Sequence, residues 1–314
     1  MRTPLDVHLY VTPRCNLSCP HCYYDAMERG RQPADTLDLQ EIGRILTGLC
    51  ERFDADVSLE GGEPFMRAGL GSMLSTLDAS VLARITITTN GTVRVAAPKA
   101  VLSQLGGLRI SIDGHTDQLQ QELRGVEVAP VLATCASLRS MRVAYTVRMT
   151  LYRGNVRLLR DIYSWLAANE IARISLFEYQ ASGRGIGQDQ MFGVSSSDIE
   201  QLLSDLLRLP RPPGLELLTL NLAQRRVESA MSRQEELSDA GVGLLQLPEN
   251  ANCTINYNGT VGVSPWLVTA SGSPDIFTST HSPTFLDEIE QAAVRGGLHD
   301  AGPCLSRIQL RYER

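Results

Sequence analysis

The stretch "DVHLYVTPRCNLSCPHC" (residues 6–22) joins a short apolar run to three closely spaced cysteines. β-Branched and apolar residues over 6–12 predict a β-strand. Cys15, Cys19 and Cys22 follow that strand directly, in a C-x3-C-x2-C spacing. A loop at the carboxyl end of a parallel strand is where such sheets place their sites. The stretch therefore predicts the first strand of an α/β fold and a binding site at its end.

Strand patterns alternate with helical patterns as far as about residue 180. The strand patterns cover residues 6–12, 56–61, 84–90, 108–113, 143–152 and 172–179, and the main helical patterns cover 39–53, 97–105 and 155–170. Six strands alternating with helices favour a parallel sheet with right-handed crossover connections. The periodicity does not decide whether this sheet stays open or curls into a partial barrel.

This rhythm ends at the Gly-rich polar loop "ASGRGIGQDQ" (181–190). Further helices are expected over 195–209, where serines are placed to cap the helix, over 222–238, and near 285–296. Asn258-Gly259 lies between two alternating segments, which predicts a β-hairpin over 253–264 with a type I′ turn. We therefore expect a core unit at residues 1–183 and a C-terminal α+β extension at 184–314.

The composition is that of an ordinary soluble globular protein, with 43% hydrophobic and 20% charged residues among 314. The formal net charge of −6 argues against nucleic acid as a partner, because binding it usually demands a basic surface. The sequence contains no run of eighteen apolar residues and no secretory signal pattern, so no membrane segment is expected. Seven cysteines, an odd number, make a disulfide framework improbable and favour a reducing cytoplasm.

The cysteine cluster has three readings: a zinc site, an iron–sulfur cluster, or core packing. Structural zinc requires four protein ligands, usually in paired knuckles, and no second C-x2-C is present in the sequence. Three thiolates hold a four-iron cluster while leaving one iron open. An open iron is valuable only in a reactive site, so the spacing favours the iron–sulfur reading.

The segment "CNLSCPHC" (15–22) resembles the signature of the radical S-adenosylmethionine (SAM) superfamily, C-x3-C-x-aromatic-C, with His21 at the aromatic position. Further segments resemble the family's other motifs in the same order: "GGEP" (61–64), "TTNGT" (88–92), "SIDG" (111–114), "RG" (124–125) and "VRMTLYRGN" (147–155). The resemblance covers about residues 5–180 and implies a partial (β/α)6 barrel. It also implies a [4Fe–4S] cluster on the three cysteines, with SAM on the open iron.

The resemblance implies a set of SAM-binding residues as well. The set is His21, Tyr23, Gly61, Gly62, Glu63, Pro64, Asn90, Ser111, Asp113 and Arg148. The backbone of the GGEP segment is expected to meet the SAM amino group, and Arg148 its carboxylate. From the residues alone, Gly61-Gly62 and Asn90-Gly91 also fit ordinary turns, Asp113 fits a helix cap, and Arg148 fits a surface strand position.

The extension resembles the SPASM or twitch type, whose hairpin has the form I-x-x-x-G-x-V-x-x-C. In "INYNGTVGVS" (255–264) the expected terminal cysteine is Ser264, and "LLQLPEN" before the hairpin supplies no thiol. Cys50 and Cys135 fit buried core positions. Cys253 and Cys304 leave a second iron–sulfur cluster open, although their placement argues against the standard arrangement.

The type I′ turn would pair Cys253 with Ser264 and place Cys253, Ile255 and Tyr257 on one face of the hairpin. The related architecture puts this hairpin near the barrel mouth. There the Cys253 thiol is expected to return a hydrogen atom to a substrate radical, which would produce an epimer. The alternative is an inert buried cysteine.

These expectations lead to a radical SAM epimerase acting on a small cationic natural product. The resemblance is to the aminoglycoside (neomycin-type) epimerases of antibiotic biosynthesis, with a reductant such as flavodoxin or ferredoxin as protein partner. The alternatives are a dehydrogenase or peptide-modifying enzyme with an auxiliary iron–sulfur cluster, and a non-catalytic zinc-binding module.

Overall fold

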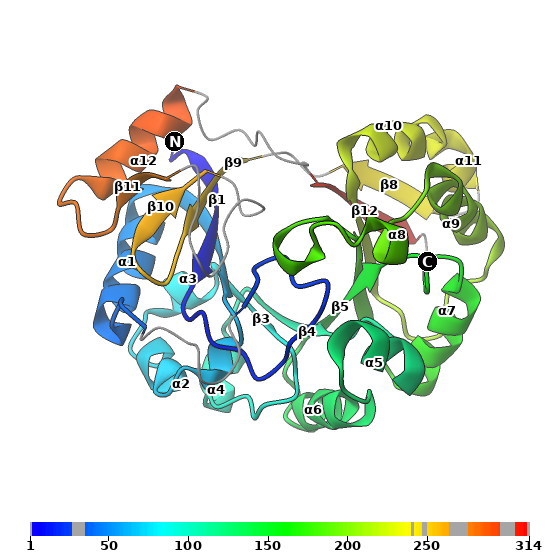
Figure 1. Ribbon diagram of the computed structural model, residues 1–314, viewed down its shortest axis with the longest axis horizontal. Helices are drawn as coiled ribbons and strands as arrows, with labels where there is room; N and C mark the ends of the chain where they lie inside the picture. Colours follow the sequence, from blue (N-terminus) through cyan, green and yellow to red (C-terminus); the bar gives the residue numbers. More distant parts are fainter. Residues whose placement is uncertain are drawn as a thin grey trace.

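The computed structural model describes residues 2–26, 35–239, 242–246, 250–263, 276–295 and 305–312. Within these ranges, twelve strands form one sheet in the order β11-β10-β9-β1-β2-β3-β4-β5-β6-β7-β12-β8. Figure 1 shows the sheet as a curved, open wall with helices on its outer side. The fold is α/β, with the mainly parallel sheet of a partial barrel, as the alternation of strands and helices predicts.

The six expected strands form the middle of the sheet and all run parallel to their neighbours. They are β1 (Pro4–Tyr10), β2 (Asp54–Glu60), β3 (Ile85–Thr89), β4 (Gly107–Ser111), β5 (Thr146–Leu151) and β6 (Arg173–Glu178). A seventh parallel strand, β7 (Leu217–Ala223), follows β6 and was not expected. Its last two residues fall in the range 222–238, for which the sequence pattern predicts a helix. A fully buried strand lacks the alternation that marks a half-exposed strand, so the pattern does not reveal β7.

Helices accompany this sheet, and most of them cover its outer face (Figure 1). They are α1 (Leu39–Arg52), α2 (Leu70–Leu74), α3 (Ala79–Leu82), α4 (Lys99–Leu102), α5 (Asp117–Arg124), α6 (Ala129–Ser140), α7 (Leu159–Ala168), α8 (Asp189–Phe192), α9 (Ser196–Arg208), α10 (Gln224–Ser232), α11 (Gln234–Asp239) and α12 (Phe285–Val294). Capping boxes begin α1 at Asp38 and α9 at Ser195, so the expected serine cap of α9 is confirmed. The single helix expected over 222–238 is two helices, which meet at Arg233.

Side chains alternate between the two faces of the central strands. Val7, Val57 and Ile87 belong to the hydrophobic core under the helices. The residues that alternate with these face the concave side, where the Glu60 carboxylate hydrogen-bonds to His8 and accepts the Thr88 hydroxyl. The concave face therefore carries polar side chains that the helices do not cover, and these form the wall of the site.

The C-terminal extension adds strands to both edges of the sheet (Figure 1). At one edge β9 (Ala251–Ile255) pairs in parallel with β1, followed by β10 (Thr260–Gly262) and β11 (Ile276–Ser279). At the other edge β12 (Leu305–Tyr312) lies antiparallel between β7 and β8 (Val242–Gln246). The residues after 184 thus continue the sheet of the core instead of forming a sheet of their own.

The hairpin of β9 and β10 is confirmed, but its expected turn is wrong. Val261 pairs with Ile255, and the Asn256 N–H donates to the Thr260 carbonyl at 2.9 Å, so three residues form the loop. A type I′ turn needs positive φ at both central residues, whereas here only Gly259 has it, at +81°. A three-residue loop that ends in a left-handed glycine shifts the register by one. The expected partner of Cys253, Ser264, lies outside the described residues.

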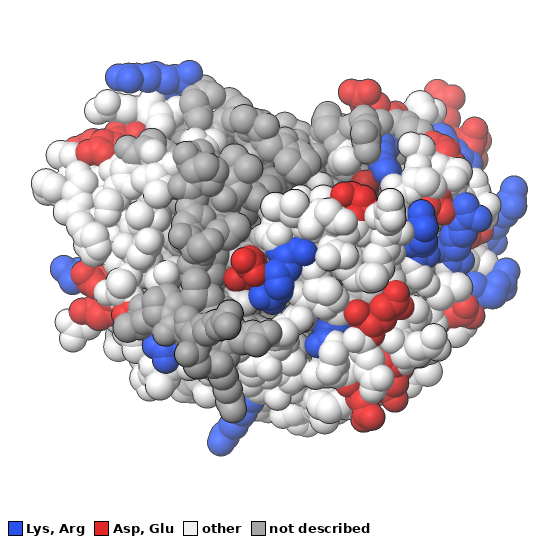
Figure 2. Space-filling model, viewed as in Figure 1, with Lys and Arg blue, Asp and Glu red and all other residues white. Residues whose placement is uncertain are grey.

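Acidic and basic side chains are interspersed over the described part of the face in Figure 2, and neither sign gathers into one continuous patch there. Among the helices that the structure describes, none has both the length and the apolar character needed to cross a bilayer.

Candidate functional site

A pocket with a cavity volume of about 130 Å³ opens at the carboxyl ends of β1 to β6. Ten of the predicted site residues line it: Cys15, Cys19, His21, Cys22, Tyr23, Gly61, Gly62, Asn90, Ser111 and Arg148. The pocket therefore brings together residues from five separate sequence motifs at the sheet edge where the first strand predicted a site.

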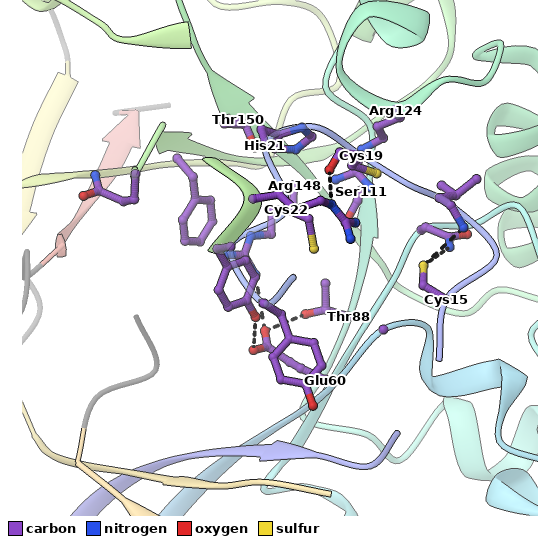
Figure 3. Close-up of a pocket in the computed structure, with 18 of the residues that line it drawn as sticks. Cys15, Cys19, His21, Cys22, Glu60, Thr88, Ser111, Arg124, Arg148 and Thr150 are labelled. Carbon is purple, nitrogen blue, oxygen red and sulfur yellow. Dashed lines mark hydrogen bonds and ion pairs between the residues drawn. The ribbon is translucent and has the colours of Figure 1, made fainter. Parts of the chain in front are cut away.

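The three cysteines surround one space in the pocket, as Figure 3 shows. Cys15 and Cys19 are buried, and Cys22 is half-buried. Burial, with a smaller contribution from the neighbouring Cys22 thiol, raises the pKa of Cys15 to about 11 and that of Cys19 to about 12. Three soft thiol donors on one wall suit an iron–sulfur cluster, whose binding displaces the thiol protons.

The Gly61-Gly62-Glu63 segment packs its backbone against the chain that leads into Cys15. The Gly62 N–H donates to the Thr12 carbonyl at 2.8 Å, and the Glu63 N–H donates to the Arg14 carbonyl at 2.7 Å. A Cβ on Gly62 would lie 2.0 Å from the Arg14 carbonyl oxygen, so only glycine fits at this position. This contact fixes the height above the sheet of the loop that carries Cys15, Cys19 and Cys22, which we call the cysteine loop.

Glu63 and Pro64 support the wall of the pocket from behind and are absent from its lining. The buried Glu63 carboxylate accepts hydrogen bonds from the Asn90 N–H and the Thr89 hydroxyl, both at 2.7 Å. Burial raises the pKa of Glu63. Pro64 begins the short 3-10 turn η1 (Pro64–Met66). Glu63 thus ties the GGEP segment to the loop after β3.

Asn90 follows β3, Ser111 ends β4 and Arg148 lies within β5, and all three line the pocket. The Asn90 side-chain amide lies 3.9 Å from the Cys15 sulfur and donates to the Asn16 side chain at 2.9 Å. Ser111 and Arg148 are neighbours in the register of β4 and β5. The Arg148 guanidinium stacks 3.9 Å above the ring centre of Phe177, so its position in the pocket is fixed.

Glu60, the last residue of β2, is a charged pocket residue that the sequence reasoning missed. Its carboxylate accepts the Tyr23 hydroxyl at 2.6 Å, lies 3.0 Å from His8 Nδ1 and lies 3.3 Å from the Arg148 guanidinium. Burial alone would raise the pKa of Glu60, but His8, Arg148 and the Tyr23 hydroxyl together hold it well below its ordinary value. An ionised carboxylate therefore faces the pocket beside Arg148.

Asp113 is buried behind the pocket, where it neither caps a helix nor reaches the lining. The helix cap at this place is Thr116. Asp113 Oδ2 lies 2.5 Å from Arg124 Nε and 3.1 Å from His21 Nε2, and Oδ1 accepts the Thr150 N–H at 2.6 Å. Burial would raise the pKa of Asp113, but Arg124, His21 and the Thr150 N–H lower it below its ordinary value.

Replacing Asp113 with asparagine is expected to lower the free energy of unfolding of the metal-free protein by about 3 kcal/mol at pH 7. A carboxylate with a lowered folded-state pKa contributes stability above its unfolded pKa of about 3.9, and this contribution is lost as the pH falls toward the folded value. Urea unfolding at pH 7, 5 and 3 should therefore show the difference between wild type and Asp113→Asn shrinking at pH 3.

Asp54→Asn is the matched control, because the Arg84–Asp54 ion pair is exposed. This variant should stay within about 0.5 kcal/mol of wild type at each pH. A difference for Asp113→Asn that remains constant from pH 7 to pH 3 would show that the carboxylate is not held ionised by its partners.

Twelve lining residues were not predicted as site residues from the sequence: Leu17, Tyr24, Glu60, Thr88, Thr89, Arg124, Thr150, Phe177, Glu178, Tyr179, Gln180 and Arg184. Half of them are among the last two residues of a strand or lie one residue before its end, so the alternation of β2 to β6 could have found most of these once the inward side was known. Leu17, Thr88, Thr89, Arg124 and Thr150 were quoted only as parts of motifs, and nothing local in the sequence points to Arg184.

Cys253 lies away from the pocket. In the parallel pairing of β9 with β1, Cys253 is the partner of Val7, and paired residues share a face. That face is the one under the helices, and Cys253 is completely buried in the main hydrophobic core. Cys135 is buried in the same core, and Cys50 packs against it half-buried. Cys304 lies outside the described residues.

Comparisons relate parts of the chain to known proteins. The family model of the Radical SAM superfamily matches residues 9–166, half of the chain. Fe-coproporphyrin III synthase of Methanosarcina barkeri is 26% identical over 206 residues, covering 63% of this chain and 51% of that protein. GTP 3′,8-cyclase of a Synechococcus strain is 37% identical over 118 residues, covering 35% of this chain and 33% of that protein. The chain thus spans about half, or less, of these relatives.

Solved structures match over a larger share of the chain. The crystal structure of Streptococcus suis SuiB bound to precursor peptide SuiA has a TM-score of 0.69 at 15% identity and covers 95% of this chain and 67% of that one. A structure of anSMEcpe with bound AdoMet and the Cp18Cys peptide has a TM-score of 0.59 at 14% identity, covering 95% of this chain and 84% of that one. At these identities the likeness is one of fold.

Proposed function

The chain belongs to the radical SAM superfamily, and from this premise we propose that it removes a hydrogen atom from a carbon of a peptide substrate. It uses a [4Fe–4S] cluster and SAM as cofactors. Held by Cys15, Cys19 and Cys22, the cluster would supply the electron for reductive cleavage of SAM, and this cleavage would provide the species that takes hydrogen from the substrate carbon. The physiological reductant we propose is a small electron carrier such as flavodoxin or ferredoxin.

The residues of the pocket have separate tasks in this proposal. Cys15, Cys19 and Cys22 hold the cluster, and the backbone of Gly61 and Gly62 lies beside it against the cysteine loop. Arg148, fixed over Phe177 and balanced by Glu60, offers a cation to the SAM carboxylate. Asn90 and Ser111 complete the SAM site at the ends of β3 and β4.

The position of Cys253 supports a reaction that needs no returning thiol. Among the described residues that line the pocket, the cysteines are Cys15, Cys19 and Cys22. The likeness to SuiB, whose structure is bound to a precursor peptide, runs over 95% of the chain and so includes the extension. These two observations favour a peptide substrate whose radical is resolved by oxidation or bond formation. Such an outcome needs an electron acceptor, which we take to be an external one-electron carrier.

Epimerisation of a cationic aminoglycoside is the second candidate function. The net charge of −6 favours a cationic substrate. This candidate requires the Cys253 thiol to reach the substrate, whereas β9 turns that side chain into the hydrophobic core, on the face that α12 covers. The register therefore favours the peptide proposal. A second cluster on Cys253 would meet the same obstacle.

Deuterium transfer is expected to identify the substrate class. The anaerobically reduced enzyme is given SAM and one of two pools deuterated at carbon: tryptic peptides from protein made in heavy water, or aminoglycosides labelled in the same way. Mass spectrometry then measures deuterium in 5′-deoxyadenosine. We expect at least tenfold more transfer from the peptide pool. Transfer from the aminoglycosides alone would overturn the peptide proposal.

Cys253→Ala separates the two functions with the same assay. On the peptide proposal the variant should modify its substrate at the wild-type rate, because the thiol lies in the core. On the epimerase proposal the variant should still transfer substrate deuterium to 5′-deoxyadenosine but give no epimer. Cys135→Ala, another buried core thiol, controls for the loss of packing.

A further inference from the structure

The segment after β6 runs from the carboxyl end of that strand to the cysteine loop, which follows β1. We call residues 180–187 the strap; it contains the short turn η2 (Gly183–Gly185). Figure 1 shows this green segment, between β6 and α8, beside the dark blue loop that follows β1. The strap therefore joins the first and sixth strands of the open barrel across the mouth of the pocket.

Arg184 makes most of the contacts between the strap and the cysteine loop. Its backbone N–H donates to the Cys22 carbonyl at 2.9 Å, and its Nε donates to the Cys19 carbonyl at 3.0 Å. Its Nη1 donates to the Ala26 carbonyl at 2.5 Å and lies 3.2 Å from Asp25 Oδ1. One residue thus holds the backbone of two of the three cysteines and of the chain that leaves them.

The rest of the strap is built for the same close approach. Gly183 has φ +55°, and a Cβ there would lie 2.4 Å from the Tyr23 carbonyl oxygen and 2.5 Å from that of Cys22. The Ser182 hydroxyl donates to the Tyr23 carbonyl at 3.3 Å. At Gly183 the strap thus lies so close to the cysteine loop that a side chain there would overlap backbone oxygens.

Arg184 also brings a positive charge to the pocket lining. One of its guanidinium nitrogens, Nη2, is buried and has no hydrogen-bond partner among the described residues. A cluster held by three thiolates is anionic and becomes more so when it accepts an electron. A nearby cation favours the reduced form, and groups around the ligands tune a metal centre as much as the ligands do.

We propose that Arg184 is a positioning residue for the iron–sulfur cluster. Through the carbonyls of Cys19 and Cys22 it holds the cysteine loop in the conformation that binds the cluster, and its charge raises the reduction potential. The inference rests on the superfamily's cofactor and not on the substrate class. The peptide proposal and this one can therefore fail separately.

The test compares Arg184→Gln with Arg184→Lys and with the control Arg173→Gln. Arg173 lies at the opposite end of β6, in an exposed ion pair with Glu216. Each protein is reconstituted anaerobically, its iron is extracted with a chelator, and its midpoint potential is measured by redox titration with electron paramagnetic resonance. None of these readouts depends on substrate turnover.

Arg184→Gln should lose iron to the chelator at least tenfold faster than wild type. At a fixed potential its ratio of reduced to oxidised cluster should be about tenfold lower, a shift of about −59 mV for a one-electron couple. Arg184→Lys keeps the charge without the forked donors, so its potential should recover while its iron is still lost faster. Arg173→Gln should match wild type in both measurements.

A wild-type rate of iron loss and a wild-type potential in Arg184→Gln would overturn the proposal. Circular dichroism of the metal-free proteins checks that the variants fold. If Arg184→Gln does not fold, Arg184→Lys decides: iron loss at the wild-type rate would then overturn the positioning role.

Discussion

Replacing Cys19 with alanine is expected to abolish reductive cleavage of SAM. Cys19 is one of three thiols around the pocket, and in the described part of the chain no further cysteine lines it. Two thiolates leave a four-iron cluster with two open irons and a weaker hold. We expect iron content to fall to background and 5′-deoxyadenosine formation to drop at least about 10³-fold, equivalent to about 4 kcal/mol of barrier.

Cys50→Ala is the control for this prediction. Cys50 is half-buried on α1, on the helix side of the sheet and outside the pocket. Its removal should leave iron content and SAM cleavage unchanged, and it controls for the general loss of one thiol. Full iron loading and wild-type cleavage in Cys19→Ala would mean that the three cysteines do not act as one ligand set.

The central sheet was predictable because the strands that form it follow local patterns. β1 to β6 appear in the sequence as short apolar runs, and their parallel pairing follows from the helices between them. No local pattern indicates where β12 joins the sheet, because it pairs with β7 across more than eighty intervening residues. Which edge the extension joins is decided by tertiary contacts, and these have no signature in a short window.

Alternation alone also left the role of Cys253 undecided. The sequence pattern places Cys253, Ile255 and Tyr257 on one face of the hairpin, but the inward face depends on the partner strand. The pairing of Cys253 with Val7 settles this, and it turns the thiol toward the helices. The turn was misjudged for a related reason: Asn-Gly suits both a type I′ turn and a loop that ends in a left-handed glycine.

Glu60 and Arg184 were missed for different reasons. Glu60 is the last residue of β2 and precedes the two glycines of the GGEP motif, which was read without the strand before it. The alternation of β2 already places the Glu60 side chain on the opposite face of the sheet from Leu59. Arg184 meets the cysteine loop across 165 residues of chain, so no spacing rule connects it to Cys19. Sequence motifs thus led to many of the residues that line the pocket and gave no account of what holds them in place.

Replacing Gly62 with alanine should destabilise the protein and disturb the cluster together. A Cβ at this position would lie 2.0 Å from the Arg14 carbonyl oxygen and 2.8 Å from the Cys15 backbone nitrogen. Both atoms belong to backbone, so no flexible side chain can yield. We expect the free energy of unfolding of the metal-free protein to fall by at least about 3 kcal/mol in urea titrations, and iron content after reconstitution to fall with it.

The same substitution at Gly43, within α1, is expected to have the opposite sign. The nearest atom to a Cβ on Gly43 is the Met73 sulfur at 3.6 Å, an ordinary contact, so the methyl group has room. Alanine in a helix interior is favoured over glycine by about 0.5–1 kcal/mol, and Gly43→Ala should stabilise the protein by that amount with its iron content unchanged. Equal stability of Gly62→Ala and wild type would contradict the close backbone approach on which the position of Cys15 depends.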